Sequence, residues 1–412
     1  MEQHRRSGSH ILLDKSALSR NIRFLRGLCG EAVFSSVVKG NAYGHGIESF
    51  VPLAEDCGVR HFSAFSAREA ERVYRSMTAD SHVMIMGFVE DGDLEWAVRK
   101  GISFYVFTVE RLVAALRAAR SAGRPALVHL ELETGMHRLG LERDELDTVI
   151  RLVLGNPEQV TVAGVSTHLA GAESVANYVR VSDQLTRFGE LCDRLREAGV
   201  SFRVRHAASS AGLLMYPESA LDLVRVGIAQ YGLWPTMEVK MHYLLSRQRQ
   251  SVRQVRDPLH RVLTWRSCIM SVKDVAAGKF VGYGTAYQTT RRERIASIPT
   301  GYYDGFPRLL SNRGHVLVRG RRAPVLGTVN MSMMLVDVTH IPDVGPGDEV
   351  IIIGKQGRRT VSVASFSDFS DVMNYEALVR LPSDLPRVVL PGVRSANGMR
   401  RRITDDRSDD ES

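Results

Sequence analysis

The sequence predicts an α/β protein in which an N-terminal (β/α)8 TIM barrel precedes a mostly β domain. Within the first 235 residues, about eight short apolar segments alternate with helical patterns, and this number of units suits a (β/α)8 barrel. After about Arg247 the apolar segments continue, but helix signals become few. The chain has 412 residues, which is too long for one ordinary core, so two domains are expected.

The barrel strands are expected at short apolar segments. In chain order these read VFSSVVK, HFSAFS, HVMIMG, SFYVF, ALVHLELE, VTVAGVSTHL, FRVRHAA and LVRVGIAQYG. Between them, apolar residues recur at helical spacing, as in residues 18–29, and Ser66 with Glu69 forms a capping box that begins a helix. A doubly wound sheet is the alternative, but it requires a glycine-rich fingerprint, and the GHG of residues 44–46 lacks the third glycine.

The second domain is expected to consist of strands separated by turns. Its strand candidates read VLTWRSCIMSV, RIASIPTGY, HVLVRG, APVLGTVNMSMMLVDV and DEVIIIG, and turns such as SNRG and VGPGD separate them. The expected organisation is a polar leader over residues 1–10, the barrel over 11–245, the β domain over 246–392 and a charged, disordered tail over 393–412.

Composition and charge argue against several classes of protein. Apolar residues make up 44% and charged residues 24% of the chain, as in soluble globular proteins. No apolar run approaches ~18 residues, so no membrane span is expected, and the N-terminus lacks the apolar segment of a signal peptide. Four cysteines without C-x-x-C spacing are typical of a reducing cytoplasm. The net charge of +8 lies largely in short arginine runs without interleaved aromatic residues, so nucleic-acid binding is not expected.

Reactive side chains end several of the expected barrel strands, where barrel enzymes carry their chemistry. Lys39 ends the first strand candidate and precedes the small-residue stretch GNAYGHG. A lone lysine there is usually a surface charge, but it can also form a Schiff base with an aldehyde. Other strand ends provide His168, Ser210 and Arg225 beside small residues whose N–H groups suit a phosphate. His206 is interpreted as a packed structural histidine of the barrel.

The stretch VVKGNAYGHG resembles the lysine motif of fold-type III pyridoxal-phosphate enzymes, specifically the alanine racemases. Further segments resemble the same family in the same order: ETGMHRLG, STHLAGAES, HAASSAGLLMYPESALDLVRVGIAQYGLWP, VGYGTAY, IPTGYYDGFPRLLSNRG and NMSMMLVDVT. The resemblance covers about residues 10–390. It implies an amino-acid racemase that converts L-alanine to D-alanine, with pyridoxal 5'-phosphate as cofactor and no metal.

By this resemblance, Lys39 carries the cofactor covalently, and the residues that contact its phosphate are Tyr43, Ser210, Gly227 and Ile228. Arg225 matches the arginine that faces the pyridine nitrogen, where its permanent charge disfavours a proton. Reprotonation at Cα then competes better with transamination. His168 matches a histidine that links Arg225 to the catalytic tyrosine. Arg138 matches an arginine near the cofactor's phenolic oxygen and the substrate carboxylate.

Racemisation requires proton exchange on both faces of a planar intermediate, so two bases on opposite sides are expected. The resemblance assigns one role to Lys39 and the other to Tyr283, which a partner subunit supplies. Tyr302 and Met331 match residues at the substrate entrance and carboxylate, also from the partner. The implied assembly is a homodimer with composite active sites.

Several positions depart from the family pattern. Glu131 stands where many members have a carbamylated lysine, and it is expected to pair with Arg138 as a permanent anion. His137 replaces a glycine, and Asn330 replaces a cysteine. Ser383 stands where a tyrosine that touches the phosphate and limits the pocket is expected. The last two changes favour appreciable serine activity beside alanine, so a serine or broader-specificity racemase is the alternative.

Two other interpretations use the same fold differently. An amino-acid decarboxylase would place a carboxylate, rather than Arg225, against the pyridine nitrogen. A non-catalytic pyridoxal-phosphate-binding protein would consist of a single barrel, without the second domain and without Tyr283.

Overall fold

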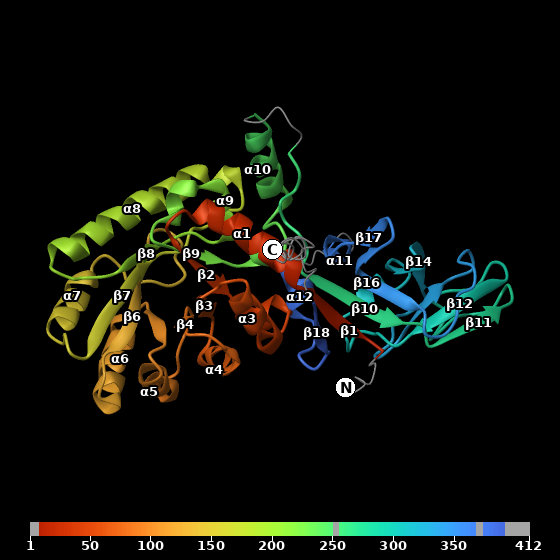
Figure 1. The fold of residues 1–412 in the computed structure, drawn as a ribbon, viewed down its shortest axis with the longest axis horizontal. Helices are drawn as coiled ribbons and strands as arrows, with labels where there is room; N and C mark the ends of the chain where they lie inside the picture. The colour runs from red at the N-terminus through yellow and green to blue at the C-terminus, as the bar shows by residue number, and fades with distance from the viewer. Residues whose placement is uncertain (1–7, 250–254, 368–373, 392–412) are drawn as a thin grey trace, which may run out of the picture.

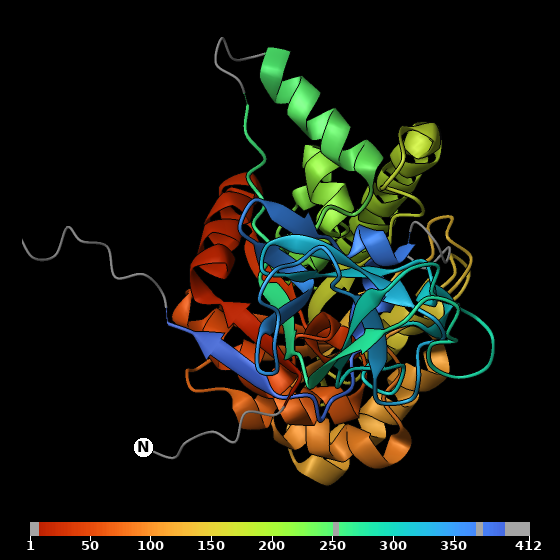
Figure 2. The same cartoon turned by 90° about the vertical axis from the view of Figure 1, so that its right-hand side faces the viewer.

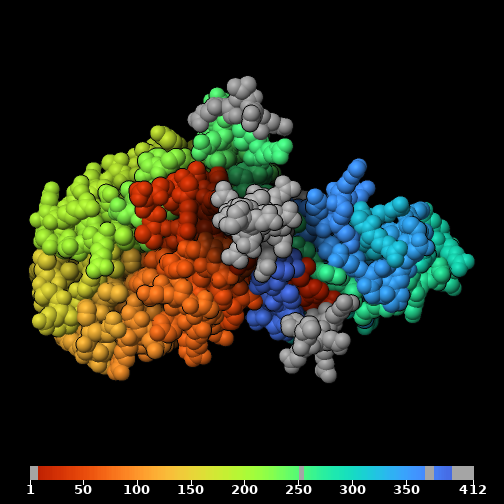
Figure 3. Space-filling model, in the orientation of Figure 1, coloured from red at the N-terminus to blue at the C-terminus, as the bar shows by residue number. Residues whose placement is uncertain are grey.

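The molecule has two lobes, a barrel of alternating strands and helices and a second, mostly β lobe (Figure 1). The structure is a computed structural model that describes residues 8–249, 255–367 and 374–391. The space-filling view shows the two lobes side by side along the long axis (Figure 3). Seen along that axis, the second lobe lies in front of the barrel (Figure 2).

The barrel consists of parallel strands in the order β8-β7-β6-β5-β4-β3-β2-β9. The strands are β2 (Val33–Val37), β3 (His61–Ala64), β4 (His82–Ile85), β5 (Ser103–Val106), β6 (Ala126–Glu131), β7 (Val160–Ser166), β8 (Val204–His206) and β9 (Leu223–Val226). At the two ends of this sheet, Arg225 N donates to Ala208 O at 3.0 Å and Asp222 N donates to Arg205 O at 3.1 Å. The predicted barrel is therefore confirmed.

Helices surround the strands on the outside of the barrel (Figure 1). They are α1 (Lys15–Cys29), α3 (Ile47–Asp56), α4 (Ala67–Ser76), α5 (Asp91–Arg99), α6 (Val109–Ala122), α7 (Leu146–Leu154), α8 (Tyr178–Glu197) and α9 (Ser210–Met215). The apolar residues of α1 at helical spacing are buried, as predicted. Ser66 caps α4 by accepting a hydrogen bond from Glu69 N at 3.3 Å, which confirms the predicted helix start.

The second lobe contains a larger sheet in the order β11-β12-β15-β14-β13-β16-β10-β1-β18, and β17 also pairs with β16. Its strands are β1 (His10–Asp14), β10 (Leu263–Cys268), β11 (Ser271–Val275), β12 (Glu293–Ile298), β13 (His315–Val318), β14 (Arg321–Leu326), β15 (Met334–Asp337), β16 (Glu349–Gln356), β17 (Arg359–Val361) and β18 (Arg387–Leu390). The short helices α11 (Ala364–Ser367) and α12 (Asn374–Val379) precede β18, and α10 (Met237–Arg249) follows the barrel. The mostly β second domain is therefore confirmed.

The N-terminal strand corrects one predicted boundary. Residues from 11 onward were expected in the barrel, but β1 pairs with β10 and β18 of the second sheet. Ile11 and Leu13 alternate with partly exposed neighbours and are buried, so one face of β1 closes the core of the second lobe. The barrel thus begins at α1. The predicted tail and most of the predicted leader lie outside the described residues.

Three further observations bear on the class of protein. No described helix is both long enough and apolar enough to cross a membrane. All four cysteines are free thiols. Within the described ranges, no group of three or more His, Cys, Asp or Glu side chains is placed to hold a metal ion.

Candidate active site

Lys39 lies at the end of β2 and begins a short left-handed turn, α2 (Lys39–Tyr43). Gly40 has a φ of 62°, and the following residues Asn41, Ala42 and Tyr43 have φ values of 55°, 54° and 50°. A left-handed conformation costs a non-glycine residue roughly 1–2 kcal/mol. Such strain persists only where surrounding contacts impose it, and it concentrates at functional sites. The turn therefore marks Lys39 as a candidate functional residue.

The charges near Lys39 favour its neutral amine. Burial lowers the pKa of Lys39, and the nearby guanidinium of Arg138 lowers it further, as does that of Arg225. The carboxylate of Glu69 acts in the opposite direction and raises it. A neutral amine is the form that attacks an aldehyde to give a Schiff base.

A small cradle forms where β9 ends, opposite the lysine turn. Ser210 Oγ accepts hydrogen bonds from Gly227 N at 2.9 Å and from Ala229 N at 3.4 Å. A Cβ atom added to Gly227 would lie only 2.6 Å from the hydroxyl of Tyr43, so glycine is required here. Ile228 follows Gly227 and is buried. The predicted phosphate contacts thus converge, and two hydroxyls beside backbone N–H groups suit a phosphate.

An aromatic wall borders the cradle. Tyr375, on α12, lies edge-on to the Tyr43 ring with centroids 6.2 Å apart, and its hydroxyl donates to Pro235 O at 3.1 Å. Ser383 is exposed, and its carbonyl oxygen accepts a hydrogen bond from Arg387 at 3.1 Å. Tyr375 is thus a second aromatic residue at the cradle that the sequence did not indicate, and the role of Ser383 in place of the pocket tyrosine stays a prediction.

Arg225 is held from several sides in the barrel interior. Its terminal nitrogens donate to the carbonyl oxygens of Thr167 at 2.8 Å, Ala207 at 3.0 Å and His206 at 3.0 Å. One of them also contacts His206 Nδ1 at 2.5 Å. An arginine can only donate, so His206 Nδ1 must accept and carry no proton. Within the described chain, the Nε–H of Arg225 is then the donor left for a ligand.

His206 is a satisfied histidine of the barrel interior, as interpreted from the sequence, and it also holds Arg225. Its Nε2 lies 2.9 Å from His129 Nδ1, and both rings are buried. Burial, and next the positive charge of Arg225, lowers the pKa of His206 well below its ordinary value. A neutral His206 fixes the orientation of Arg225 without adding charge. The signal available in the sequence was that HLE ends β6 and RH ends β8, with β7 between them.

His168 is neutral as well, but it does not contact Arg225 as the resemblance implied. Burial, followed by the charges of Arg225 and Arg138, lowers the pKa of His168 to about 3. No hydrogen bond joins its ring to Arg225 in the described part of the chain, and Arg225 bonds to Thr167 and His206 instead. The expected bridge is therefore absent from this single chain.

Glu131 is buried, but it does not form the expected ion pair. Its side chain lies at the end of β6, and its Oε2 atom has no hydrogen-bond partner. Burial raises the pKa of Glu131, although the nearby charges of Arg225 and Arg138 oppose the shift. Arg138 is exposed, and neither a hydrogen bond nor an ion pair joins it to Glu131 among the described residues. Glu131 thus acts on Arg138 at a distance.

The segment before Arg138 explains one departure from the family pattern. His137 has a φ of 56°, a left-handed conformation that favours the glycine found in the family. The carboxylate of Glu133 accepts hydrogen bonds from the backbone N–H groups of Gly135, of Met136 at 2.7 Å and of His137 at 2.8 Å. These bonds fix the segment so that a histidine is tolerated.

The remaining predicted residues lie in the second lobe, whereas Lys39 lies in the barrel. Tyr283 is 74% exposed, Met331 is 59% exposed and Tyr302 is 41% exposed. Tyr283 belongs to the segment between β11 and β12, which lie at the end of the molecule away from the barrel (Figure 1). Asn330 Oδ1 is buried and has no hydrogen-bond partner. One chain therefore does not bring these residues to the lysine turn.

Comparison with known proteins gives matches over both lobes. Residues 13–235 match the family described as alanine racemase, N-terminal domain, and residues 262–389 match alanine racemase, C-terminal domain. The alanine racemase of Symbiobacterium thermophilum is 37% identical over 376 residues, which cover 91% of this chain and 95% of the relative.

Solved structures agree with these matches. Alanine racemase from Streptomyces lavendulae has a TM-score of 0.84 and 29% identity, covering 94% of this chain and 98% of that one. Alanine racemase from Bartonella henselae, solved with covalently bound pyridoxal phosphate, has a TM-score of 0.78 and 25% identity, covering 93% and 100%. Both the barrel with its lysine turn and the second lobe are thus shared, and the chain belongs to the alanine racemase family of amino-acid racemases.

Proposed function

We propose that this protein racemises alanine with pyridoxal 5'-phosphate bound at Lys39, and that its active form is a homodimer. The observation that carries the proposal is the cradle of Tyr43, Ser210 and Gly227 beside a strand-end lysine, with Arg225 facing the same space. The absence of a Cβ at Gly227 keeps this cradle open. The cradle fits a phosphate, and the lysine fits an aldehyde.

The residues of the cradle would hold the cofactor. Tyr43 and Ser210 offer hydroxyl groups to the phosphate, with the backbone at Gly227 and Ile228 beside them. When bound, pyridoxal phosphate supplies an electron-withdrawing system that acidifies the Cα–H of an attached amino acid. Arg225 keeps a fixed positive charge at the ring-nitrogen side, because His206 and three carbonyl oxygens hold it in place. Its charge disfavours a further proton there and so favours proton return to Cα.

Lys39 and a partner's tyrosine are proposed to exchange protons on opposite faces of the substrate. The lowered pKa of Lys39 allows its amine to accept a proton near neutral pH. The equivalent of Tyr283 in a second copy of the chain would hold the proton on the other face. Arg138 is exposed and would bind the substrate carboxylate through a bidentate contact.

The composite site supports a dimer. Tyr283, Tyr302 and Met331 are exposed in one chain and lie in the lobe that does not carry Lys39. Large exposed aromatic and apolar side chains are typical of interfaces. Tyr283, the proposed second base, lies in the lobe away from the Lys39 of its own chain, so a second copy would complete the site.

Alanine is the proposed substrate. The aromatic wall of Tyr375 and Tyr43 narrows the space beside the cradle, which favours a small side chain. Appreciable serine activity, expected from Ser383 and Asn330, stays the alternative to strict alanine specificity. The position of Arg225 argues against a decarboxylase, and the presence of the second lobe argues against a non-catalytic barrel.

The test is a time course with purified protein and L-alanine, in which D-alanine is measured with a D-amino-acid oxidase. The wild type should produce D-alanine only with pyridoxal phosphate present. Lys39→Ala should lose both the absorbance of the bound cofactor and the activity. Reduction with borohydride followed by peptide mapping should find the pyridoxyl group on Lys39, and finding it on another lysine would overturn the proposal.

A further inference from the structure

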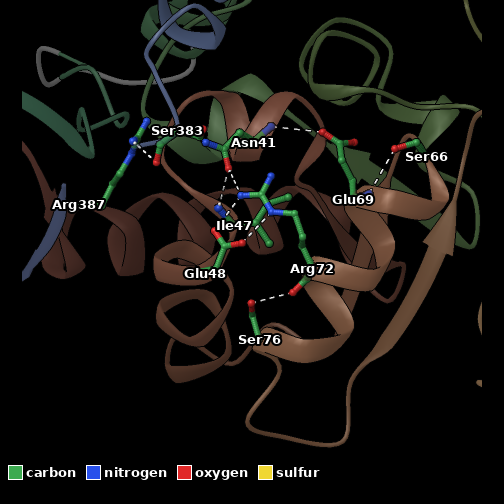
Figure 4. A network of polar contacts seen from close by, with 9 residues as sticks. All are labelled: Asn41, Ile47, Glu48, Ser66, Glu69, Arg72, Ser76, Ser383 and Arg387. Atoms are coloured by element: carbon green, nitrogen blue, oxygen red, sulfur yellow. Dashed lines mark hydrogen bonds and ion pairs between the residues drawn. The ribbon is translucent and has the colours of Figure 1, made fainter. Parts of the chain in front are cut away.

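The turn after Lys39 is unusual because four consecutive residues have a left-handed backbone conformation. Gly40, Asn41, Ala42 and Tyr43 all have positive φ, so this segment does not continue β2 or start an ordinary helix. Its conformation needs partners outside the turn. These partners come from α4 on one side and from the second lobe on the other (Figure 4).

Glu69 binds the beginning of the turn. Its Oε1 atom accepts hydrogen bonds from Gly40 N at 2.7 Å and from Asn41 N at 3.3 Å. Its Oε2 atom accepts a hydrogen bond from Phe65 N at 3.1 Å. The sequence predicted Glu69 as the third residue of a capping box, which would bond back to the N–H of Ser66. The carboxylate instead joins the start of α4 to the two residues that follow Lys39.

Arg72, one turn further along α4, supports the same segment. Its guanidinium donates to Asn41 Oδ1 at 2.7 Å and pairs with Glu48 at 2.7 Å. Asn41 Oδ1 also accepts a hydrogen bond from Ile47 N at 3.2 Å. The side chain of Asn41 is therefore fixed at the same time as its backbone N–H (Figure 4).

The end of the turn is held by the second lobe. Arg387, on β18, donates to Gly44 O at 2.9 Å and to Pro382 O at 2.5 Å. A Cβ atom on Gly44 would clash with the carbonyl oxygen of Leu378, on α12. The turn is thus fixed at both ends, and among the described side chains only Glu69 accepts hydrogen bonds from the backbone N–H groups of the two residues directly after Lys39.

We propose that Glu69 is a positioning residue that holds the Gly40–Asn41 backbone and thereby sets where the Lys39 side chain starts. This inference rests on the proposed function, because it assigns Glu69 to the orientation of the cofactor-binding lysine. The supporting observations are two hydrogen bonds that one carboxylate accepts from consecutive residues with positive φ and a third that it accepts from Phe65 N. Its negative charge also raises the pKa of Lys39, against the effect of Arg138.

The test compares Glu69→Ala and Glu69→Gln with Glu71→Ala and Glu71→Gln in the full-length protein. Glu71 is the matched control, because it lies on the same helix and pairs with Arg75 on the exposed side. Hydrogen–deuterium exchange of the peptide over residues 38–46 reports the turn, and the peptide over 66–76 reports α4. Labelling of Lys39 by pyridoxal phosphate and borohydride, measured as a rate against pH, reports the lysine.

Glu69→Ala should raise exchange in the turn about 10-fold or more, since it removes charge-assisted hydrogen bonds, while most of α4 keeps its protection. The limiting rate of Lys39 labelling at high pH should fall, because the amine is less well positioned, while the pH midpoint shifts downward because a negative charge is lost. Glu69→Gln retains an acceptor oxygen and should restore part of the protection of the turn without restoring the pH midpoint. Both Glu71 variants should match the wild type.

Equal exchange in the turn of Glu69→Ala and the wild type would overturn the inference. So would a rise in exchange spread evenly over α4, which would assign Glu69 to helix capping alone. The proposed function has a separate test, because it would be overturned if Lys39→Ala still bound the cofactor. The hydrogen–deuterium exchange of the turn does not depend on the cofactor.

Discussion

Acid should destabilise this protein strongly, because several histidines are buried in their neutral form. His45, His129 and His206 are exposed by 1%, 2% and 0%. Burial lowers the pKa of His45 to about 4 and that of His129 to about 3, and it lowers the pKa of His206 well below its ordinary value. The unfolded chain, by contrast, protonates its histidines near their ordinary pKa of 6.5.

The direction in which the free energy of unfolding changes with pH follows from proton binding. Below pH 6.5 the unfolded chain binds more protons than the folded chain, so the free energy of unfolding falls as the pH falls. The stabilisation is complete above pH 6.5. At pH 5 His45 and His129 each contribute a loss of about 2 kcal/mol, about 4 kcal/mol together, and His206 adds a loss in the same direction. This loss is comparable with the whole stability of an ordinary domain. Glu131 acts in the opposite direction, because burial raises its pKa.

Urea unfolding followed by tryptophan fluorescence at pH 7.5, 6 and 5, at fixed protein and cofactor concentrations, measures this effect. His45→Gln should lower stability at pH 7.5 because it loses contacts with the Ala42 and Tyr43 carbonyls, but it should reduce the drop between pH 7.5 and 5 by about 2 kcal/mol. His242→Gln, on the exposed side of α10, is the control and should leave the drop unchanged. A drop below about 2 kcal/mol in the wild type, or an equal drop in His45→Gln, would refute the reasoning.

Three further predictions concern the active site. Tyr283→Phe should keep the cofactor and lose about 10²–10⁴-fold in kcat, and mixing it with Lys39→Ala should restore activity through hybrid dimers; no restoration despite confirmed subunit exchange would contradict a shared site. Glu131→Gln should lower kcat/KM for alanine about 10-fold or more with a smaller effect on Tm, because Arg138 loses a nearby charge, and unchanged kinetics would contradict this role. Tyr375→Ala should raise serine turnover relative to alanine, measured as a ratio of kcat/KM, because it removes part of the aromatic wall, and Ser383→Tyr should lower that ratio; a ratio unchanged in both variants would contradict a role of these positions in specificity.

The barrel could be predicted because its signal is local. Each strand is a short apolar run, and each helix has apolar residues at a spacing that a single face requires. The N-terminal strand could not be assigned in the same way. HILLD reads like any barrel strand, but its antiparallel partner is Leu263–Cys268, about 250 residues away. Which sheet a strand joins depends on its pairing with a distant segment. The five residues of HILLD do not indicate which segment that is.

The strand-end residues of the site could also be predicted. Lys39, Ser210 and Arg225 come together because the ends of parallel barrel strands meet at one face. Tyr375 was missed because its position depends on how α12 docks against the barrel. The hydrogen bonds of His206 were missed because they run through the barrel interior, where sequence spacing carries no information on ring orientation.

The electrostatics of the site explain why an anion and an aldehyde suit the same place. Lys39, Arg138 and Arg225 bring positive charge, while burial keeps His168 and His206 neutral. The two guanidinium groups, which cannot lose their protons, lower the pKa of the lysine and favour its neutral amine. That amine is the nucleophile for an aldehyde, and the same positive field attracts a phosphate. The two arginines therefore favour both the binding of a phosphate and the reactivity of Lys39 toward an aldehyde. A ligand that carries only a phosphate or only an aldehyde would make only one of these two interactions.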